Sequence, residues 1–178
     1  MAIVLHLIPF EFRFILLTAI TPILFFLRPS AETKNIDLGL NSHNLSESIV
    51  AVMPLTLLMA LPIFVIAAAI EPRYDNSELS IFFYIFYILI SCPFQEFAYR
   101  GYLFTALDIL SISRWSKIIV AAILYSFVHI VYRDNYILIF TFISGIIWNI
   151  HYEKYRNLVS VAVSHSILGV LTIILKLI

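Results

Sequence analysis

The sequence predicts an all-α, polytopic membrane protein, a helical bundle of about six transmembrane helices around a polar cavity inside the bilayer. Of the 178 residues, 62% are hydrophobic and 12% are charged, and the mean hydropathy is +0.99. An average soluble domain is about half apolar and about a quarter charged. A soluble chain of this length could not bury so much apolar surface, because the buried fraction rises only slowly with chain length. Lipid must therefore cover much of that surface.

Six apolar runs approach the ~20 residues that an α-helix needs to cross the hydrocarbon core. They are residues 14–27, 48–70, 79–107, 117–132, 136–151 and 158–178. The third run is long and contains Pro93, which removes a helical hydrogen bond and favours a kink. Ahead of the first run, Glu11 and Arg13 interrupt the apolar stretch. We therefore expect an interfacial lead-in there and not a cleaved signal peptide.

Composition also limits the organisation and the partners of the chain. Four glycines and seven prolines leave little room for a linker, so we expect one membrane domain over residues 1–178. The formal net charge is zero, which argues against a nucleic acid as partner. The single cysteine, Cys92, excludes an intramolecular disulfide and a cysteine-rich zinc site. Because the sequence shows no organelle address, we expect a multi-pass protein of a bacterial plasma membrane.

Ionisable side chains inside three of the apolar runs are the main indication of function, since such groups are costly in lipid and tend to mark sites. Glu96 and Arg100 stand four residues apart in the third run, so they share one helical face and can pair. His129 lies in the fourth run and His165 in the sixth. A carboxylate and two imidazoles that converge in a dry pocket can hold a water and deprotonate it, with or without a metal. An internal ion pair and hydrogen-bonded packing histidines are the purely structural alternative.

Five other polar or aromatic residues are expected outside such a site. His6, His43 and His151 fall near the ends of apolar runs or in loops, where a solvated or interfacial histidine is the simplest interpretation. Trp148 and Asn149 close the fifth run and fit an interfacial anchor.

Residues 95–101, Gln-Glu-Phe-Ala-Tyr-Arg-Gly, resemble the first motif of the CAAX-protease and bacteriocin-processing family, also called the Abi family of intramembrane proteases. That family shows Glu-Glu-x-x-x-Arg, then Phe-x-x-x-His, then a histidine near the last helix, often followed four residues later by Asn or Asp. Here residues 125–129 stand in the second place and residues 163–166 in the third. The resemblance covers about residues 79–171, so the part of the domain from 79 to 178 carries the motifs.

Three residues depart from the pattern of that family. Gln95 replaces the first glutamate, Tyr125 replaces the phenylalanine, and Gly169 replaces the Asn or Asp. Glutamine cannot deprotonate water, so the base would have to be Glu96. The glycine removes a polar group that could bind an oxyanion or orient water.

The resemblance implies an intramembrane endopeptidase that hydrolyses a membrane-bound or prenylated peptide. Glu96 would be the general base, or a metal ligand that activates water, while His129 and His165 would hold the water or the metal. Arg100 would fix Glu96, and Gln95 would bond water or the substrate backbone. One carboxylate and two histidines suit Zn²⁺ with an open coordination position. The same three groups, Glu96, His129 and His165, equally serve a metal-free glutamate mechanism.

Two other classes of function remain open at this point. Gln95 and Gly169 favour a catalytically inactive member that binds peptides for immunity or assembly. A proton-coupled transporter or channel would also place Glu, Arg and His inside the membrane. The small size of the chain and the absence of sequence repeats argue against a transporter.

Overall fold

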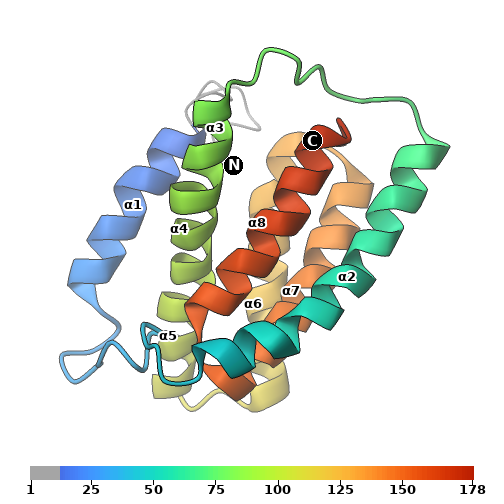
Figure 1. Cartoon of the computed structure of the whole chain (residues 1–178). Helices are drawn as coiled ribbons and strands as arrows, with labels where there is room; N and C mark the ends of the chain where they lie inside the picture. Colours follow the sequence, from blue (N-terminus) through green and yellow to red (C-terminus); the bar gives the residue numbers. More distant parts are fainter. Residues whose placement is uncertain (1–12) are drawn as a thin grey trace.

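The computed structural model describes residues 13–178, with side chains from residue 19 onward, and every regular element in this range is helical. The all-α bundle predicted from the sequence is confirmed (Figure 1). The elements are α1 (Arg13–Leu27), α2 (Leu45–Ala69), α3 (Ile81–Phe86), η2 (Tyr87–Ser91), α4 (Cys92–Glu96), η3 (Phe97–Leu103), α5 (Phe104–Ile109), α6 (Arg114–Val128), η4 (His129–Tyr132), α7 (Asn135–Tyr155) and α8 (Leu158–Ile174). The expected lead-in ahead of the first helix lies outside the described residues.

The helical stretches of the described residues follow the six apolar runs of the sequence. Three of them, Leu45–Ala69, Ile81–Ile109 and Arg114–Tyr132, are long and apolar enough to cross a membrane, and α8 is a shorter apolar helix. Large apolar side chains such as Leu57, Phe64 and Phe82 are exposed on the outside of the bundle. Lipid would cover these side chains, as the hydropathy of the sequence predicts.

The stretch Ile81–Ile109 is one continuous rod built from α-helical and π-helical turns. The π-helical turns η2 and η3 lie on either side of α4. Pro93 does not break the rod, because the ring follows directly after the wider turn η2. A π-helical turn adds a residue to the turn and so changes which side chains face a given neighbour. The side chains of α4 and η3 therefore do not point where an ideal α-helix would place them.

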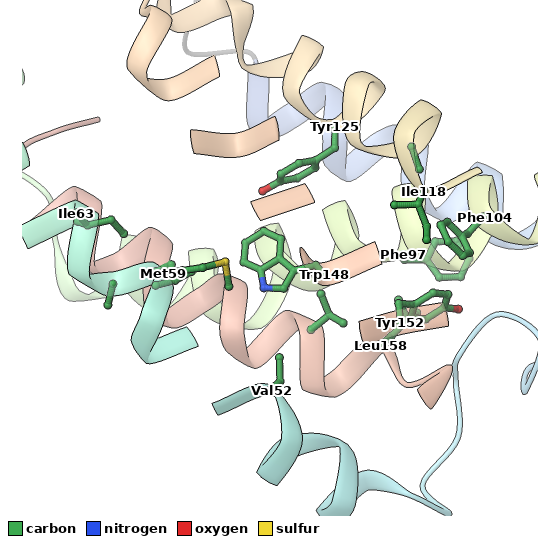
Figure 2. Close-up of a cluster of buried hydrophobic side chains, with 14 of the residues drawn as sticks. Val52, Met59, Ile63, Phe97, Phe104, Ile118, Tyr125, Trp148, Tyr152 and Leu158 are labelled. Carbon is green, nitrogen blue, oxygen red and sulfur yellow. The ribbon is translucent and has the colours of Figure 1, made fainter. Parts of the chain in front are cut away.

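The helices pack as two pairs beside the rod, in which α2 and α8 run parallel and α6 and α7 run antiparallel. In Figure 1, α2 lies against α8 in front, α6 lies against α7 behind, and α1 lies beside the rod. Gly145 in α7 lets this helix approach α6 closely, since an added Cβ would meet the Cα atom of Ala122 at 3.1 Å. Figure 2 shows the resulting core, in which the rings of Tyr125 and Trp148 lie next to each other with centroids 5.9 Å apart.

Polar caps fix where the helices of the site begin. Ser113, Asp134 and Asn157 precede α6, α7 and α8, and each side chain accepts a hydrogen bond from a backbone N–H in the first turn. The loop after α2 and the end of the chain lie at the same end of the bundle, because the backbone N–H of Arg73 donates to the carbonyl of Lys176.

Candidate active site

A carboxylate and an imidazole from two different helices form the centre of the site. Glu96, the last residue of α4, accepts a hydrogen bond at Oε1 from Nδ1 of His165 in α8, at 2.7 Å. Glu96 is fully buried and His165 is 4% exposed. Because the two residues are 69 positions apart in sequence, this contact ties the rod to α8. The sequence motifs thus meet in space.

Arg100 holds the carboxylate from the next turn of the rod. Its Nη1 donates to Oε1 of Glu96 at 3.3 Å and lies 3.2 Å from Oε2, so the pair expected from the i, i+4 spacing is present. Its Nε donates to Oδ1 of Asn149 at 3.0 Å, and Nδ2 of Asn149 donates to the carbonyl of Ile118 at 2.8 Å. The guanidinium also lies over the ring of Tyr125, 4.3 Å from its centroid. A carboxylate, an amide and an aromatic face together stabilise this charge inside the membrane.

The side chains of Tyr125 and Trp148 pack around the imidazole of His165. The hydroxyl of Tyr125 lies 3.4 Å from Nε2 of His165, and the indole of Trp148 packs on the imidazole with centroids 5.1 Å apart. Nε1 of Trp148 donates to the hydroxyl of Ser164 at 2.9 Å, and the hydroxyl of Thr56 in α2 lies 2.6 Å from the same oxygen. Hydrogen bonds between α2, α7 and α8 therefore fix the aromatic wall against which His165 rests.

His129 lies at the start of η4, on the far side of Tyr125. Its ring packs against Tyr125, with centroids 5.0 Å apart, and Nδ1 lies 2.8 Å from the Tyr125 carbonyl oxygen. A carbonyl only accepts hydrogen bonds, so Nδ1 carries the proton and Nε2 is the free acceptor of this ring. Tyr125 contacts both His129 and His165, and it is the residue through which the two histidine motifs approach each other.

Gln95 is not brought into this arrangement. Its Nε2 donates to the hydroxyl of Ser91 on the same rod at 3.2 Å, and the side chain is half-buried. The role expected for Gln95, a bond to water or to the substrate backbone, stays a prediction. It is Glu96 that faces α8, between the two π-helical turns.

The donor set does not take the form of a metal centre. Among the described residues, no three His, Cys, Asp or Glu side chains are placed so that they could hold one metal ion. Glu96 and His165 bond directly to each other, and Nδ1 of His129 is engaged by a backbone carbonyl. The zinc set considered from the sequence therefore does not fit this arrangement, and we derive no step through a metal.

Sequence reasoning misplaced three residues of the fifth apolar run. Trp148 and Asn149 are 2% and 0% exposed, so the interpretation as an interfacial anchor was wrong. His151 is 4% exposed and lies 3.0 Å and 3.1 Å from the hydroxyls of Ser48 and Ser160, so it is not a solvated histidine. His43, in contrast, is exposed in a loop as expected, and His6 lies outside the described residues.

The sequence contains a pattern that predicts burial of Trp148 and Asn149. Ser144, Gly145, Trp148, Asn149 and Tyr152 recur at spacings of three and four, which places small, polar and aromatic residues on one face of α7. In a membrane helix such a face turns towards the bundle interior.

A small pocket lies beside this centre. It encloses about 80 Å³, enough for a few water molecules. Among its lining residues are Tyr87, Tyr125, His129, His165 and Gly169, and we call it the site pocket. Its lining continues to Arg73 and Ile178 at the end of the bundle that carries the C-terminus, and no Asp or Glu of the described residues lines it.

A second, larger cavity lies on the opposite face of α8. It has a volume of about 1150 Å³ between α1, α2, the rod and α8 and is open to the outside of the bundle, and apart from Thr21 and Ser166 its lining is apolar. Phe25, Phe64 and Phe97 contribute aromatic rings to it. We call it the apolar cavity. It has the size and the chemistry to hold a lipid chain.

Comparison with known proteins identifies the family. The family model described as type II CAAX prenyl endopeptidase Rce1-like matches residues 77–171, which contain Glu96, Arg100, His129 and His165. No curated protein and no solved structure matches the chain. The match covers more than half of the chain and confirms the resemblance inferred from the three motifs. The chain is therefore a membrane-embedded member of the type II CAAX prenyl endopeptidase Rce1-like family.

Proposed function

We propose that this protein hydrolyses a peptide bond of a membrane-bound or lipidated substrate, with the Glu96–His165 pair as the unit that handles the proton. Membership of the family supports an intramembrane endopeptidase. The observation that carries the proposal is the 2.7 Å hydrogen bond between Oε1 of Glu96 and Nδ1 of His165. Carboxylate–imidazole pairs of this kind orient the base and stabilise the imidazolium that forms during hydrolysis.

In this pair His165 takes the proton from water and Glu96 supports it. The sequence had suggested Glu96 itself as the base, but His165 lines the site pocket and Glu96 does not. Because Nδ1 of His165 donates to the carboxylate, Nε2 carries no proton and is the basic nitrogen of the ring. It accepts a long hydrogen bond, 3.4 Å, from the hydroxyl of Tyr125 until a water takes that place. Arg100 balances the charge of Glu96 and holds the carboxylate in position. The roles of Glu96 and Arg100 are thus to position His165.

The reaction follows from these atoms. The oxygen of a water in the site pocket attacks the substrate carbonyl carbon while one of its protons moves to Nε2 of His165. The tetrahedral adduct then collapses, the C–N bond breaks, and His165 returns the proton to the leaving nitrogen. Nε2 of His129, the unprotonated nitrogen of that ring, belongs to a residue that lines the same pocket, and we assign it the role of a second hydrogen-bond acceptor for water there.

The apolar cavity supports a lipidated substrate. A peptide that carries a prenyl group must keep that chain out of water while its backbone reaches the catalytic groups. The apolar cavity borders Ser166, the residue next to His165, so lipid chain and scissile bond would lie on the two sides of α8.

The test is cleavage of a fluorogenic farnesylated CAAX peptide by purified protein in liposomes. We expect Glu96→Gln and His165→Gln each to lower kcat/KM by at least about 10³-fold, since both substitutions disable the proton-handling pair. The matched control is His151→Gln, a buried histidine that lines neither cavity and should keep wild-type kcat. Wild-type rates in both site variants would overturn the proposal, provided that thermal unfolding shows all proteins folded.

Two observations favour a second candidate, a member that binds peptides without cleaving them. No carboxylate among the described residues lines the site pocket, and residue 95, the first motif position, is a glutamine bonded to its own helix. This candidate predicts saturable binding of the same farnesylated peptide with no product, and equal affinity for wild type and Glu96→Gln.

A further inference from the structure

The hydroxyl of Tyr87 occupies the space that a side chain at position 169 would need. A Cβ atom added to Gly169 would lie 2.0 Å from the Tyr87 hydroxyl oxygen and 2.7 Å from Cζ of the same ring. Non-bonded atoms essentially never come this close to a Cβ atom. The Tyr87 side chain in this position and any side chain at 169 therefore exclude each other. Gly169 thus leaves open the space that the Tyr87 side chain fills.

Tyr87 is held in this position by its surroundings on the rod. It begins the π-helical turn η2, it is 7% exposed, and its ring stacks on Phe83 with centroids 6.2 Å apart. Its ring also stands perpendicular to that of His165, at 6.4 Å between centroids and 89° between planes. A buried ring with contacts on two sides can present its hydroxyl in one place.

That place is a wall of the site pocket, one turn along α8 from His165. His165 and Gly169 are four residues apart and share a face of the helix. Tyr87, His165 and Gly169 all line the site pocket. A substrate carbonyl that is attacked by a water at His165 would develop its negative charge within reach of this wall.

The Tyr87 hydroxyl itself lies near the thiol of Cys92, a weak hydrogen-bond partner that a carbonyl oxygen can replace, whereas several other donors of the pocket have stronger partners. Thr172 donates to the carbonyl of Gly169 at 2.8 Å, Thr141 to that of Ile137 at 2.7 Å, and Trp148 to Ser164. Ser144 also lines the pocket; it is buried and its hydroxyl makes no hydrogen bond among the described residues, so it is the competing candidate.

We propose that the Tyr87 hydroxyl is the donor that binds the substrate carbonyl oxygen and stabilises the oxyanion that forms there. This inference rests on the proposed function, because it assigns a residue to the same site. The hydroxyl gives its hydrogen bond to the carbonyl oxygen, which gains negative charge as the water attacks, and no proton needs to be transferred. A side-chain donor fixed in advance at that point acts mainly in the transition state.

The first arm of the test removes only the hydroxyl. For cleavage of the farnesylated peptide, we expect Tyr87→Phe to lower kcat by roughly 10²–10³-fold with little change in KM, the loss typical for removal of one oxyanion donor. Thermal unfolding should be unchanged, because the ring and its stacking on Phe83 remain. Ser144→Ala should lose less than about tenfold, below the loss typical for an oxyanion donor. If Tyr87→Phe keeps the wild-type kcat, or if Ser144→Ala shows the larger loss, the assignment is wrong.

The second arm exchanges the donor between the two positions. Gly169→Asn alone should unfold at a lower temperature than wild type and lose activity, because its Cβ collides with Tyr87. The pair Tyr87→Ala with Gly169→Asn vacates that space and supplies an amide N–H, so it should regain at least tenfold over Tyr87→Ala. A pair no more active than Tyr87→Ala would contradict the exchange.

Failure of the proposed function remains distinguishable from failure of this inference. If wild type binds the farnesylated peptide without cleaving it, hydrolysis is refuted while the hydrogen bond to the carbonyl can still be measured by binding. In that case Tyr87→Phe should bind the peptide at least about fivefold more weakly than wild type. Equal affinity would overturn the role of Tyr87 as well.

Discussion

Two clusters of charged side chains among the described residues differ in how fully their members are paired. The end cluster joins Asp108, Lys117, Glu153 and Arg156, where α5 and α7 end and α6 begins. Lys117 contacts both carboxylates, at 2.8 Å for Glu153, and Arg156 contacts both as well, at 2.5 Å for Asp108. Every charge there has two opposite neighbours. All four charges of the end cluster are therefore paired within the cluster.

The central cluster, Glu96, Arg100 and His165, is more deeply buried and leaves some of its hydrogen-bonding atoms without a partner among the described residues. Oε2 of Glu96 lies 3.2 Å from Nη1 of Arg100 but out of line for a hydrogen bond, and both Oε2 and Nη2 of Arg100 are buried without a hydrogen-bond partner among the described residues. In the end cluster, by contrast, Asp108 and Arg156 are about one third exposed. Unused hydrogen-bonding capacity in a membrane interior is costly, and proteins keep it mainly where function needs it. The comparison separates a structural ion network from a site.

The largest effect on stability is expected for Arg100→Met. This change leaves the carboxylate of Glu96 buried beside His165 without its main counter-charge, so the free energy of unfolding should fall by about 3–5 kcal/mol. Denaturant unfolding in detergent micelles measures it. Adding Glu96→Gln to the variant should restore much of the loss, because the unpaired charge is then gone. If Arg100→Met is as stable as wild type, Arg100 is not the main counter-charge of the buried carboxylate.

Lys117→Met tests the end cluster and should separate stability from chemistry. Arg156 remains near both carboxylates, and both are partly exposed, so we expect a loss of about 1–2 kcal/mol in the free energy of unfolding. The kcat for the farnesylated peptide should stay at the wild-type value. A large loss of kcat in a folded Lys117→Met protein would mean that the two clusters are coupled.

Ser164→Ala should have a smaller effect on stability, near the level of single hydrogen bonds between membrane helices. The change removes the acceptor of the Trp148 indole N–H and the contact with Thr56, which together should lower the free energy of unfolding by about 1 kcal/mol. Because Trp148 packs on His165, its fluorescence in a Trp115→Phe background should change at the same time. Unchanged fluorescence would show that Ser164 does not position the indole.

The smallest effect is expected for Gln95→Glu. The side chain at 95 bonds to Ser91 and does not line the site pocket, so kcat for the farnesylated peptide should change by less than about threefold. A gain of 100-fold or more would give residue 95 the role of the base and would refute the assignment of that role to His165.

Much of the fold, and the pairing of Glu96 with Arg100 and His165, could be predicted from the sequence. The apolar runs locate the helices within a few residues, because hydropathy over about 20 residues depends only on local composition. The pairing of Glu96 with Arg100 follows from the i, i+4 spacing, and the convergence of Glu96 and His165 from the cost of burying each alone.

Other parts of the site could not be read from the chain. Trp148 and Asn149 stand near the end of an apolar run, so hydropathy places them at the boundary, whereas the packing of α7 against the rod buries them beside Arg100. The contact between Tyr87 and Gly169 joins residues 82 positions apart, and neither shows in sequence which space it needs.

The sequence by itself therefore determined that this is a helical membrane protein of the CAAX endopeptidase kind, since composition, spacing along one helix and motif order are local properties of the chain. Only the tertiary structure decided which atom of the central cluster faces the pocket. Two π-helical turns set the direction of Glu96, and α8 brings His165 between that carboxylate and the site pocket. The direction of a side chain depends on the backbone turn beneath it and on the helix packed against it, and neither is written in the residue types alone.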